Sequence, residues 1–329
     1  MGADRPSLGL PARALTLPER WAEGHRRPVA RVVENRGLIG EAWPYHADPL
    51  KGRWETTGEC LRIALAATGD SALRTLALAA AWAMRAMAIP SNGAMPIGTE
   101  VHLKSTTLAS RAIVAVNNVY PNLMLDWFGC WTTGDPAFRH GAERHLAVTE
   151  RDFIRPDGST IEFIEYDTAT GVPKRHFTLV GRSDDSTWSR GQAWAIAGYL
   201  RAFEETGETR WLGLAERLAA YWWGRTGDSD PVPPWDFDDG GSDAPRDTSA
   251  AAIVAEALAR LAVQPDRAAR ATRMLGRFPA LIARLTPDGR LLQGCFNRPR
   301  RVTGNAELIW GDAYLLMALE LLRTGRVFR

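Results

Sequence analysis

Apolar residues recur at helical spacing along most of this chain, and strict apolar–polar alternation is confined to short stretches. Leu78 and Trp82, for example, lie four positions apart and so fall on one face of a helix. The alternating stretches predict short strands around Ser159–Tyr166 and Arg290–Cys295. We predict about ten to twelve helices once undetected ones are allowed for, and the spacing places nine of them at residues 14–36, 71–93, 111–130, 136–158, 190–206, 209–228, 248–263, 266–285 and 306–324.

A repeated segment organises these helices. Residues 67–93 read ATGDSALRTLALAAAWAMRAMAIPSNG and residues 132–158 read TTGDPAFRHGAERHLAVTERDFIRPDG, so the TGD turn and the later turn glycine both recur after 65 residues. A third copy, ETGETRWLGLAERLAAYWWGRTGD, begins near Glu205. In each copy we predict a helix that ends at a Thr-Gly pair with the glycine in the left-handed conformation. The acidic residue that follows is then placed to cap the next helix.

Helical hairpins of this kind cannot bury both of their apolar faces alone, so they stack on their neighbours or close into a ring. No linker-like or low-complexity segment divides the chain. We therefore predict one all-α domain over residues 1–329, built as an α/α toroid.

Composition and charge exclude several classes of partner. Lys and Arg total 40 and Asp and Glu total 38, so the formal net charge of +2 favours neither nucleic acid nor an anionic membrane. No apolar run approaches the ~20 residues that a membrane helix needs. The first twenty residues lack the apolar core of a signal peptide. We expect a cytoplasmic protein with no nucleic-acid and no membrane partner.

The chain also lacks the motifs that bind common cofactors. It has no glycine-rich phosphate loop, no H-E-x-x-H and no paired C-x-x-C, and its 3 cysteines are too widely spaced for a zinc site or a disulfide framework. We therefore expect no cofactor and no metal. Its 13 tryptophans outnumber its 10 phenylalanines, but a large flat ring suits a helix core and a sugar-binding cleft equally well.

Two predicted loops carry the polar and aromatic residues from which a site can be built. GRSDDSTWSRGQAW, residues 181–194, places two acids, an Arg and two Trp at the start of a helix, and PWDFDDGGSDAPRDTS, residues 234–249, precedes another helix. Some of these side chains have a purely structural alternative, because Asp and Ser are favoured helix caps. The candidate caps are Asp184 or Asp185 in the first loop and Asp247 or Ser249 in the second.

These segments resemble the unsaturated glucuronyl hydrolases of glycoside hydrolase family 88. Members of that family read much like DDSTWARGQAWAI, then PYWDF, then RDSSAAAI. The corresponding text here, in the same order and spacing, is DDSTWSRGQAWAI at 184–196, PPWDFD at 233–238 and RDTSAAAI at 246–253. The resemblance covers roughly residues 111 to 324. It implies an (α/α)6 barrel with a sugar-acid pocket at one end, and the N-terminal part of this chain is expected to be shortened.

Enzymes of that family remove a 4,5-unsaturated uronic acid from the end of an oligosaccharide. One carboxylic acid protonates the vinyl ether at C4 and then, as a carboxylate, takes a proton from the water that adds at C5. The resemblance implies that Trp188, Arg190 and Trp194 line the sugar site, with Trp235 and Asp236 nearby. The expected partner is a small molecule, either a sugar acid or an oligosaccharide-like compound.

The family's principal acid is replaced in this chain. It lies in a helix that reads I-I-D-x-x-M-N-L, and aligning AVNNVYPNLML on Asn122 and Leu123 places Asn118 at the Asp position. An amide cannot give and take a proton as a carboxyl group does. We expect Asn118 to face the pocket near the residues that line the sugar site.

The family's second acid lies in an H-D-x-G-F motif, which this chain lacks. The nearest text, GRWETTGECL, offers Glu55 or Glu59 as a substitute. Asp126, about two helical turns beyond the replaced acid, is a third candidate proton carrier. Asp185 is a fourth candidate, and His46 is a candidate binding residue. Each of these residues also has an ordinary structural alternative, as a surface or core side chain.

We therefore predict a divergent enzyme that acts on an unsaturated uronic acid-type sugar or a related polar cyclic compound by acid/base hydration, hydrolysis or elimination. Two alternatives stay open. One is a tailoring enzyme of specialised metabolism that uses the same barrel for elimination or cyclisation, and the other is a catalytically silent sugar-binding protein. A pocket with a buried carboxylate favours an enzyme, and one with only amides and aromatic rings favours a binder. The sequence does not determine the substrate or whether the chain forms a homodimer.

Overall fold

The computed structural model describes two compact units of this chain. The described residues are 69, 71–97, 101–103, 106–108, 110–226, 230–262, 278, 281, 283–286, 289–299 and 306–325. The helical unit contains residues 157–159 and the described residues from 180 onward, and the mixed unit contains residues 69–156 and 160–179. The predicted single domain stays a prediction.

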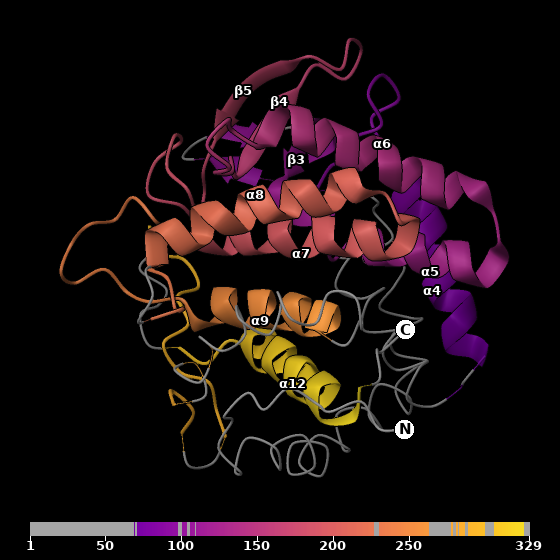
Figure 1. Cartoon of the computed structure of the whole chain (residues 1–329). Helices are drawn as coiled ribbons and strands as arrows, with labels where there is room; N and C mark the ends of the chain where they lie inside the picture. The colour runs from indigo at the N-terminus through magenta and orange to yellow at the C-terminus, as the bar shows by residue number, and fades with distance from the viewer. Residues whose placement is uncertain are drawn as a thin grey trace. The chain divides into compact units, whose positions relative to one another are not determined.

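Four helices make up the core of the helical unit (Figure 1). Helix α7 packs against α8 and α9, and α9 packs against α12. Side chains are buried along the whole of α9 and along most of α7, which is the pattern of helices surrounded by other elements. All four were predicted from the apolar spacing to within a few residues, and their bounds are α7 Ser189–Thr206, α8 Thr209–Thr226, α9 Thr248–Ala262 and α12 Ile309–Thr324.

The mixed unit combines three helices with a small antiparallel sheet. Helix α5 packs against α4 and α6, and the three-stranded sheet has the order β3-β4-β5. A separate hairpin pairs β1 with β2. The bounds of these elements are α4 Ser71–Ala86, α5 Leu123–Thr133, α6 Pro136–Phe153, β1 Val101–Leu103, β2 Thr106–Leu108, β3 Ile113–Ala115, β4 Phe163–Tyr166 and β5 Pro173–Phe177, with short 3-10 helices at Ser110–Ala112 and Val116–Val119.

The predicted turn chemistry is confirmed where the repeat places it. Gly134 and Gly207 end α5 and α7 at φ 70° and 74°, and each donates its N–H to the carbonyl four residues earlier. Asp135 caps α6 by accepting a hydrogen bond from the Ala137 N–H at 2.8 Å. Asp247, one of the candidate caps of α9, accepts from the Ser249 N–H at 3.2 Å.

The predicted cap of α7 is wrong. The residue that precedes the helix is Trp188, with no side-chain cap, and Asp184 and Asp185 are exposed in the loop before it. The Ser189 N–H instead donates to the Trp235 carbonyl at 3.1 Å. A neighbouring loop therefore satisfies a donor at the helix start that a carboxylate was expected to satisfy.

The predicted helix over residues 111–130 is wrong in its first part. Ile113–Ala115 form strand β3, which pairs antiparallel with β4, and α5 begins only at Leu123. The β-branched run Ile113–Val114 favours a strand once a partner strand is present. The predicted strand around residues 159–166 is confirmed as β4. The segment around 290–295 forms only isolated bridges among its described residues.

Other predicted elements lie outside the described residues, namely the helix at 14–36 and most of the helix at 266–285. None of the described helices is both long enough and apolar enough to cross a membrane.

Replacement of Gly207 by Ala is expected to lower the free energy of unfolding by about 1 kcal/mol, because an L side chain is strained in the left-handed region. The matched control is Gly213→Ala inside α8, where an added Cβ also meets nothing within 4 Å. That change is expected to raise the free energy of unfolding by up to ~1 kcal/mol, since Ala is the better helix former. Urea denaturation measures both, and changes of the same sign would contradict the cap assignment.

Candidate functional site

In the helical unit, the loop before α7 is paired with the loop before α9. An isolated antiparallel bridge joins Trp188 of the first loop to Asp236 of the second. Another bridge, from Pro234 to Arg246, lies within the second loop. The Phe237 N–H donates to the Thr187 carbonyl at 2.9 Å. Two segments that are about fifty residues apart in the sequence thus form one polar and aromatic cluster, as their resemblance to a sugar site implied.

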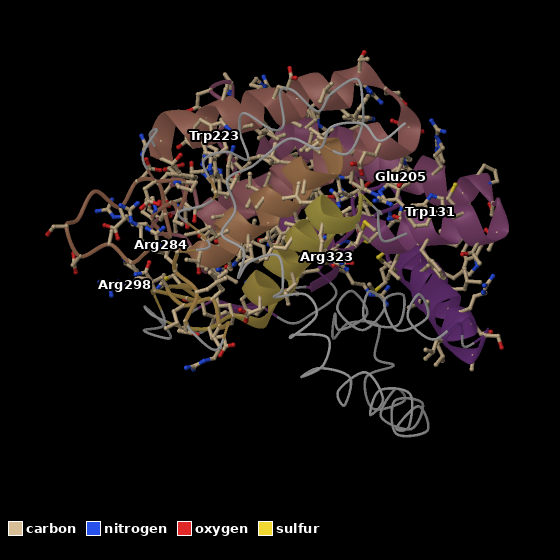
Figure 2. All side chains as sticks on the ribbon, turned by 60° about the horizontal axis from the view of Figure 1, so that its bottom comes forward. Trp131, Glu205, Trp223, Arg284, Arg298 and Arg323 are labelled. Carbon is tan, nitrogen blue, oxygen red and sulfur yellow. The ribbon has the colours of Figure 1, made fainter. Side chains whose placement is uncertain are left out.

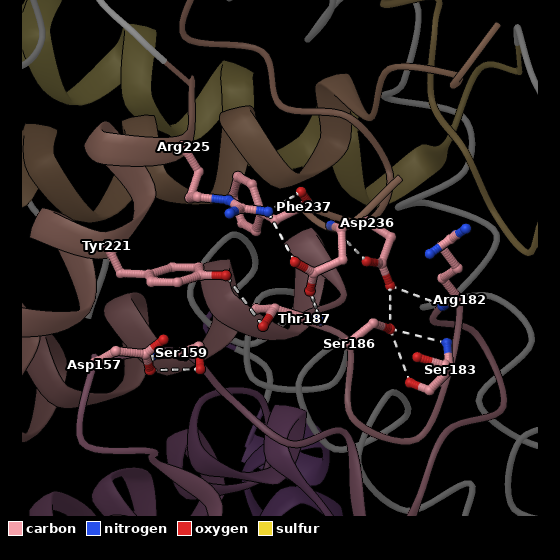
Figure 3. Close-up of polar contacts among 11 residues, drawn as sticks. Asp157, Ser159, Arg182, Ser183, Ser186, Thr187, Tyr221, Arg225, Asp236 and Phe237 are labelled. Atoms are coloured by element: carbon pink, nitrogen blue, oxygen red, sulfur yellow. Dashed lines mark hydrogen bonds and ion pairs between the residues drawn. The ribbon is translucent and has the colours of Figure 1, made fainter. Parts of the chain in front are cut away.

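Asp236 is the hub of the polar contacts in these loops (Figure 3). Its buried carboxylate accepts hydrogen bonds from the Arg182 N–H at 2.8 Å, the Ser186 hydroxyl at 2.7 Å and the Asp238 N–H at 3.0 Å. Burial raises the pKa of Asp236, and these hydrogen bonds oppose the shift. A carboxylate that is engaged in this way fixes the loop that leads into Trp188.

Asp238 makes the second link between the two loops. It accepts a hydrogen bond from the Thr187 N–H at 2.9 Å and another from the Arg225 guanidinium at 2.8 Å, and Arg225 also donates to the Phe237 carbonyl (Figure 3). Asp185, a predicted proton carrier, is exposed in this region.

Arg190 is buried at the start of α7 and is fully surrounded. Its guanidinium lies 4.7 Å from the centre of the Trp188 ring and 5.5 Å from that of Trp310. It donates to the Asp247 carboxylate at 2.5 Å and to the Cys295 and Phe296 carbonyls. The structure therefore brings Trp188 and Arg190 together, as predicted, and adds Trp310, which the sequence did not single out.

Trp194 and Trp235 lie in the same unit and are buried. Trp194 is one helical turn beyond Arg190 on α7, and its ring packs edge-on against Tyr314 with the centroids 5.2 Å apart. Trp235 donates its ring N–H to Asp239 at 2.7 Å. The roles of these residues in binding a sugar stay predictions.

The mixed unit contains a second polar cluster, built around Met95. The Asn118 side-chain amide donates to the Met95 carbonyl at 2.9 Å, and the Met95 N–H donates to Nδ1 of His145 at 3.1 Å. The Met95 sulfur accepts from Asn122 and from Arg85, at 3.6 Å in both cases. One residue therefore orders four polar side chains that come from α4, α5, α6 and the 3-10 turn before α5.

Asp126 is the acid of this cluster. It lies one turn beyond Asn122 on α5, and one carboxylate oxygen is 2.7 Å from Nε of Arg85. Its side chain has no exposed surface, and burial raises its pKa to about 7 despite the opposing pull of Arg85. Burial also lowers the pKa of His145 to about 3, and Arg85 adds to that effect. The cluster thus holds a neutral imidazole and a carboxyl group that ionises near neutral pH.

Several buried polar atoms of this cluster accept or donate no hydrogen bond within the part of the chain that the structure describes. They are Oδ1 of Asn118, Oδ1 of Asn122, Oδ2 of Asp126 and Nε2 of His145. Buried polar atoms in folded proteins normally have a partner. These atoms therefore mark a place where water or a ligand can be bound.

The sequence prediction found Asn118 and Asp126 but missed Arg85 and His145. The missed signal was a charged or imidazole side chain at a core position of an amphipathic helix. His145, for example, continues the buried face that Phe138 and Ala142 form on α6. Among the described residues, no group of three or more His, Cys, Asp or Glu side chains is arranged to hold a metal ion.

The remaining predicted residues are not tested here. Glu55, Glu59 and His46 lie outside the described residues. Asn118 lies in the mixed unit, whereas Trp188 and Arg190 lie in the helical unit. The expectation that Asn118 faces the Trp188 cluster therefore stays a prediction.

The chain is similar in sequence to unsaturated glucuronyl hydrolases and to unsaturated chondroitin disaccharide hydrolases. The chain is 35% identical over 220 residues to an unsaturated glucuronyl hydrolase of Formosa agariphila, a match that covers 63% of this chain and 54% of that protein. It is 33% identical over 211 residues to an unsaturated chondroitin disaccharide hydrolase of Streptococcus agalactiae, covering 60% and 52%. The match spans about half the length of these relatives. No protein-family model matches the chain.

Solved structures show the fold. The crystal structure of the unsaturated glucuronyl hydrolase of Bacillus sp. GL1 matches with a TM-score of 0.80 and 24% identity, over 95% of this chain and 86% of that one. The enzyme of the same name from Streptococcus agalactiae matches with a TM-score of 0.78 and 21% identity, over 96% and 82%. The predicted resemblance and the predicted (α/α)6 barrel are confirmed.

The raised pKa of Asp126 predicts how stability depends on pH. Between about pH 4, near the ordinary value of 3.8, and about pH 7, the folded protein holds a proton that the unfolded chain has released. The contribution of Asp126 to the free energy of unfolding therefore falls as the pH rises through this window, by at most about 1.4 kcal/mol per pH unit.

The measurement is urea denaturation of the wild type and of Asp126→Asn at several pH values. The difference, wild type minus variant, is expected to decrease from pH 4 to pH 7. The lowered pKa of His145 makes the free energy of unfolding rise with pH over this window in both proteins, so its contribution cancels in the difference. A difference that stays flat from about pH 5 to pH 7 would mean that Arg85 keeps the carboxylate ionised.

Proposed function

We propose, from its similarity to unsaturated glucuronyl hydrolases, that this protein is a hydrolase-like enzyme that acts on saccharides ending in an unsaturated uronic acid. We propose further that Asp126, and not Asn118, carries the proton. The substrate class is supported by the relatives. One solved unsaturated glucuronyl hydrolase is an Asp→Asn variant with dGlcA-Glc-Rha-Glc, and a Streptococcus agalactiae variant of the same kind is complexed with dGlcA-GalNAc6S.

The observation that carries the assignment is the buried carboxyl group of Asp126, which pairs with Arg85 in the Met95 cluster that also holds Asn118. Hydration of the double bond needs one group that gives a proton to C4 and then takes one from the water that adds at C5. The hemiketal that results opens and releases the rest of the saccharide. With a pKa raised to about 7, Asp126 populates both of the required forms near neutral pH.

The geometry around Asp126 suits this double role. Nε of Arg85 lies 2.7 Å from Oδ1 of Asp126, and Oδ2 accepts no hydrogen bond from the described residues. Asn118 uses its amide N–H on the Met95 carbonyl and leaves its Oδ1 unpaired. The amide can therefore accept a hydrogen bond from a sugar hydroxyl, but the proton transfer itself belongs to the carboxyl group.

A specific observation also favours the second candidate, a catalytically silent sugar-binding protein. The sequence motif predicts that Asn118 stands at the position of the family's principal acid, and solved structures of Asp→Asn variants carry saccharides in their names. In this candidate Asp126 is only the buried partner of Arg85. One assay separates the two.

The assay follows the ultraviolet absorbance of the double bond in an unsaturated uronyl disaccharide. Wild type is expected to remove the signal, and Asp126→Asn is expected to slow its loss at least ~100-fold, the usual contribution of a general acid/base group. Asp152→Asn is the matched control, because Asp152 pairs with Arg151 at 2.6 Å in the same unit but lies outside the Met95 cluster. It is expected to change the rate by less than about threefold.

Thermal unfolding of each variant shows whether a loss of activity comes from the lost proton carrier or from a lost fold. Asp126→Glu, which keeps the carboxyl group, is expected to retain part of the activity. If the wild type leaves the absorbance unchanged and Asn118→Asp removes it, the wild-type protein is a catalytically silent sugar-binding protein. A flat signal from both would reject action on this substrate class.

A further inference from the structure

Arg190 is tied to two other segments of the helical unit. Nη1 donates to Asp247 at 2.5 Å and to Ser249 at 3.2 Å, both at the start of α9. Nη1 also donates to the Cys295 carbonyl at 2.9 Å, and Nη2 donates to the Phe296 carbonyl at 2.8 Å. The guanidinium therefore joins α7, α9 and the loop at residues 294–297 at one point.

These contacts occupy the edge formed by Nη1 and Nη2, which is one of the two edges of a guanidinium that can hold a carboxylate. A carboxylate is bound most strongly by two parallel N–H groups of the fork. Here the edge formed by Nη1 and Nη2 already serves Asp247 and two carbonyls, while Trp188 and Trp310 lie against the ring plane. The charge is balanced by a carboxylate with no exposed surface, so an incoming sugar carboxylate would have to compete with Asp247.

The loop that Arg190 holds carries an exposed aromatic ring. Phe296 is 43% exposed, and its ring packs against Trp310 with the centroids 5.8 Å apart. The preceding residues of the segment are held by other groups, since Thr248 donates to the Leu292 and Gln293 carbonyls. Flat aromatic faces suit the apolar faces of sugar rings, so the position of Phe296 bears on ligand binding.

Two other ion pairs lie near this loop, one partly buried and one exposed. Arg284 and Arg298, both labelled in Figure 2, pair with Asp230 at 2.8 Å and with Asp243 at 3.3 Å, and the Asp243 side chain is 83% exposed. Exposed ion pairs contribute little to stability. Arg190 thus makes the buried, charge-assisted contacts to the loop.

We infer that Arg190 is a positioning residue that fixes the Cys295–Phe296 loop and its aromatic surface, and that it does not bind the carboxylate of the saccharide. This inference rests on the proposed function for the identity of the saccharide. The position of the loop itself does not depend on the proposed function, so the inference has two separate tests.

The first test compares an unsaturated uronyl disaccharide with its methyl ester, which lacks the negative charge. Arg190→Gln is expected to raise KM about tenfold for both compounds and to leave kcat within about threefold, because the proton carrier is untouched. A loss confined to the free acid would overturn the inference and make Arg190 the carboxylate-binding residue. If the wild type turns over neither compound, the proposed function fails and the second test decides alone.

The second test uses Cys295, which is 1% exposed, as a reporter of the loop. Labelling with a thiol reagent under native conditions, read by peptide mass spectrometry, is expected to be at least tenfold faster at Cys295 in Arg190→Gln. Arg190→Lys, which restores the charge without the fork, is expected to give an intermediate rate.

The matched control for labelling is Arg225→Gln. Arg225 also donates to a loop carbonyl and to an Asp and lies 5.8 Å from an aromatic ring centre, but in a different loop. It is expected to leave Cys295 protected. Equal labelling rates in wild type and Arg190→Gln, or equal acceleration in both glutamine variants, would overturn the inference.

Discussion

The buried pair of Arg190 and Asp247 is the interaction on which the helical unit depends. Removing two charges from water costs several kcal/mol per ion, and the attraction between them offsets this only when the remaining hydrogen-bonding groups are also used. That condition is met here, because Asp247 also accepts from Ser249 and Arg190 also donates to two carbonyls. The start of α7, the start of α9 and the segment after residue 290 are therefore fixed together.

The Met95 cluster of the mixed unit follows the opposite principle. Its charged and amide groups are as deeply buried, but several of their polar atoms have no partner in the described part of the chain. A buried polar atom without a partner costs free energy, so a sequence that keeps several of them in one place gains something other than stability. The buried polar groups around Arg190 and Asp247 thus fix loops. Those of the Met95 cluster leave atoms that can react with a bound molecule or form hydrogen bonds to it.

Much of this arrangement was open to prediction from the sequence, since it depends on local chemistry. The helices of the helical unit follow from apolar spacing, and the glycine at the end of α7 follows from the Thr-Gly pair. Strand β3 was missed because its pairing with β4 lies some fifty residues away. Arg190 was found as a site residue from its motif. Its contact with Phe296, more than a hundred residues later, depends on tertiary packing that no local pattern records.

One feature of the mixed unit links the backbone to the acid chemistry. The turn before Met95 contains Gly93 at φ +82°, and a Cβ there would lie 2.6 Å from the Arg144 side chain. That turn sets where residue 95 presents its amide, its carbonyl and its sulfur. A residue with no side chain, itself outside the cluster, therefore helps to fix the position of Met95, which accepts a hydrogen bond from Arg85, the ion-pair partner of Asp126. A substitution in this turn would thus act on the cluster through the backbone of residue 95, while every polar side chain of the cluster stays unchanged.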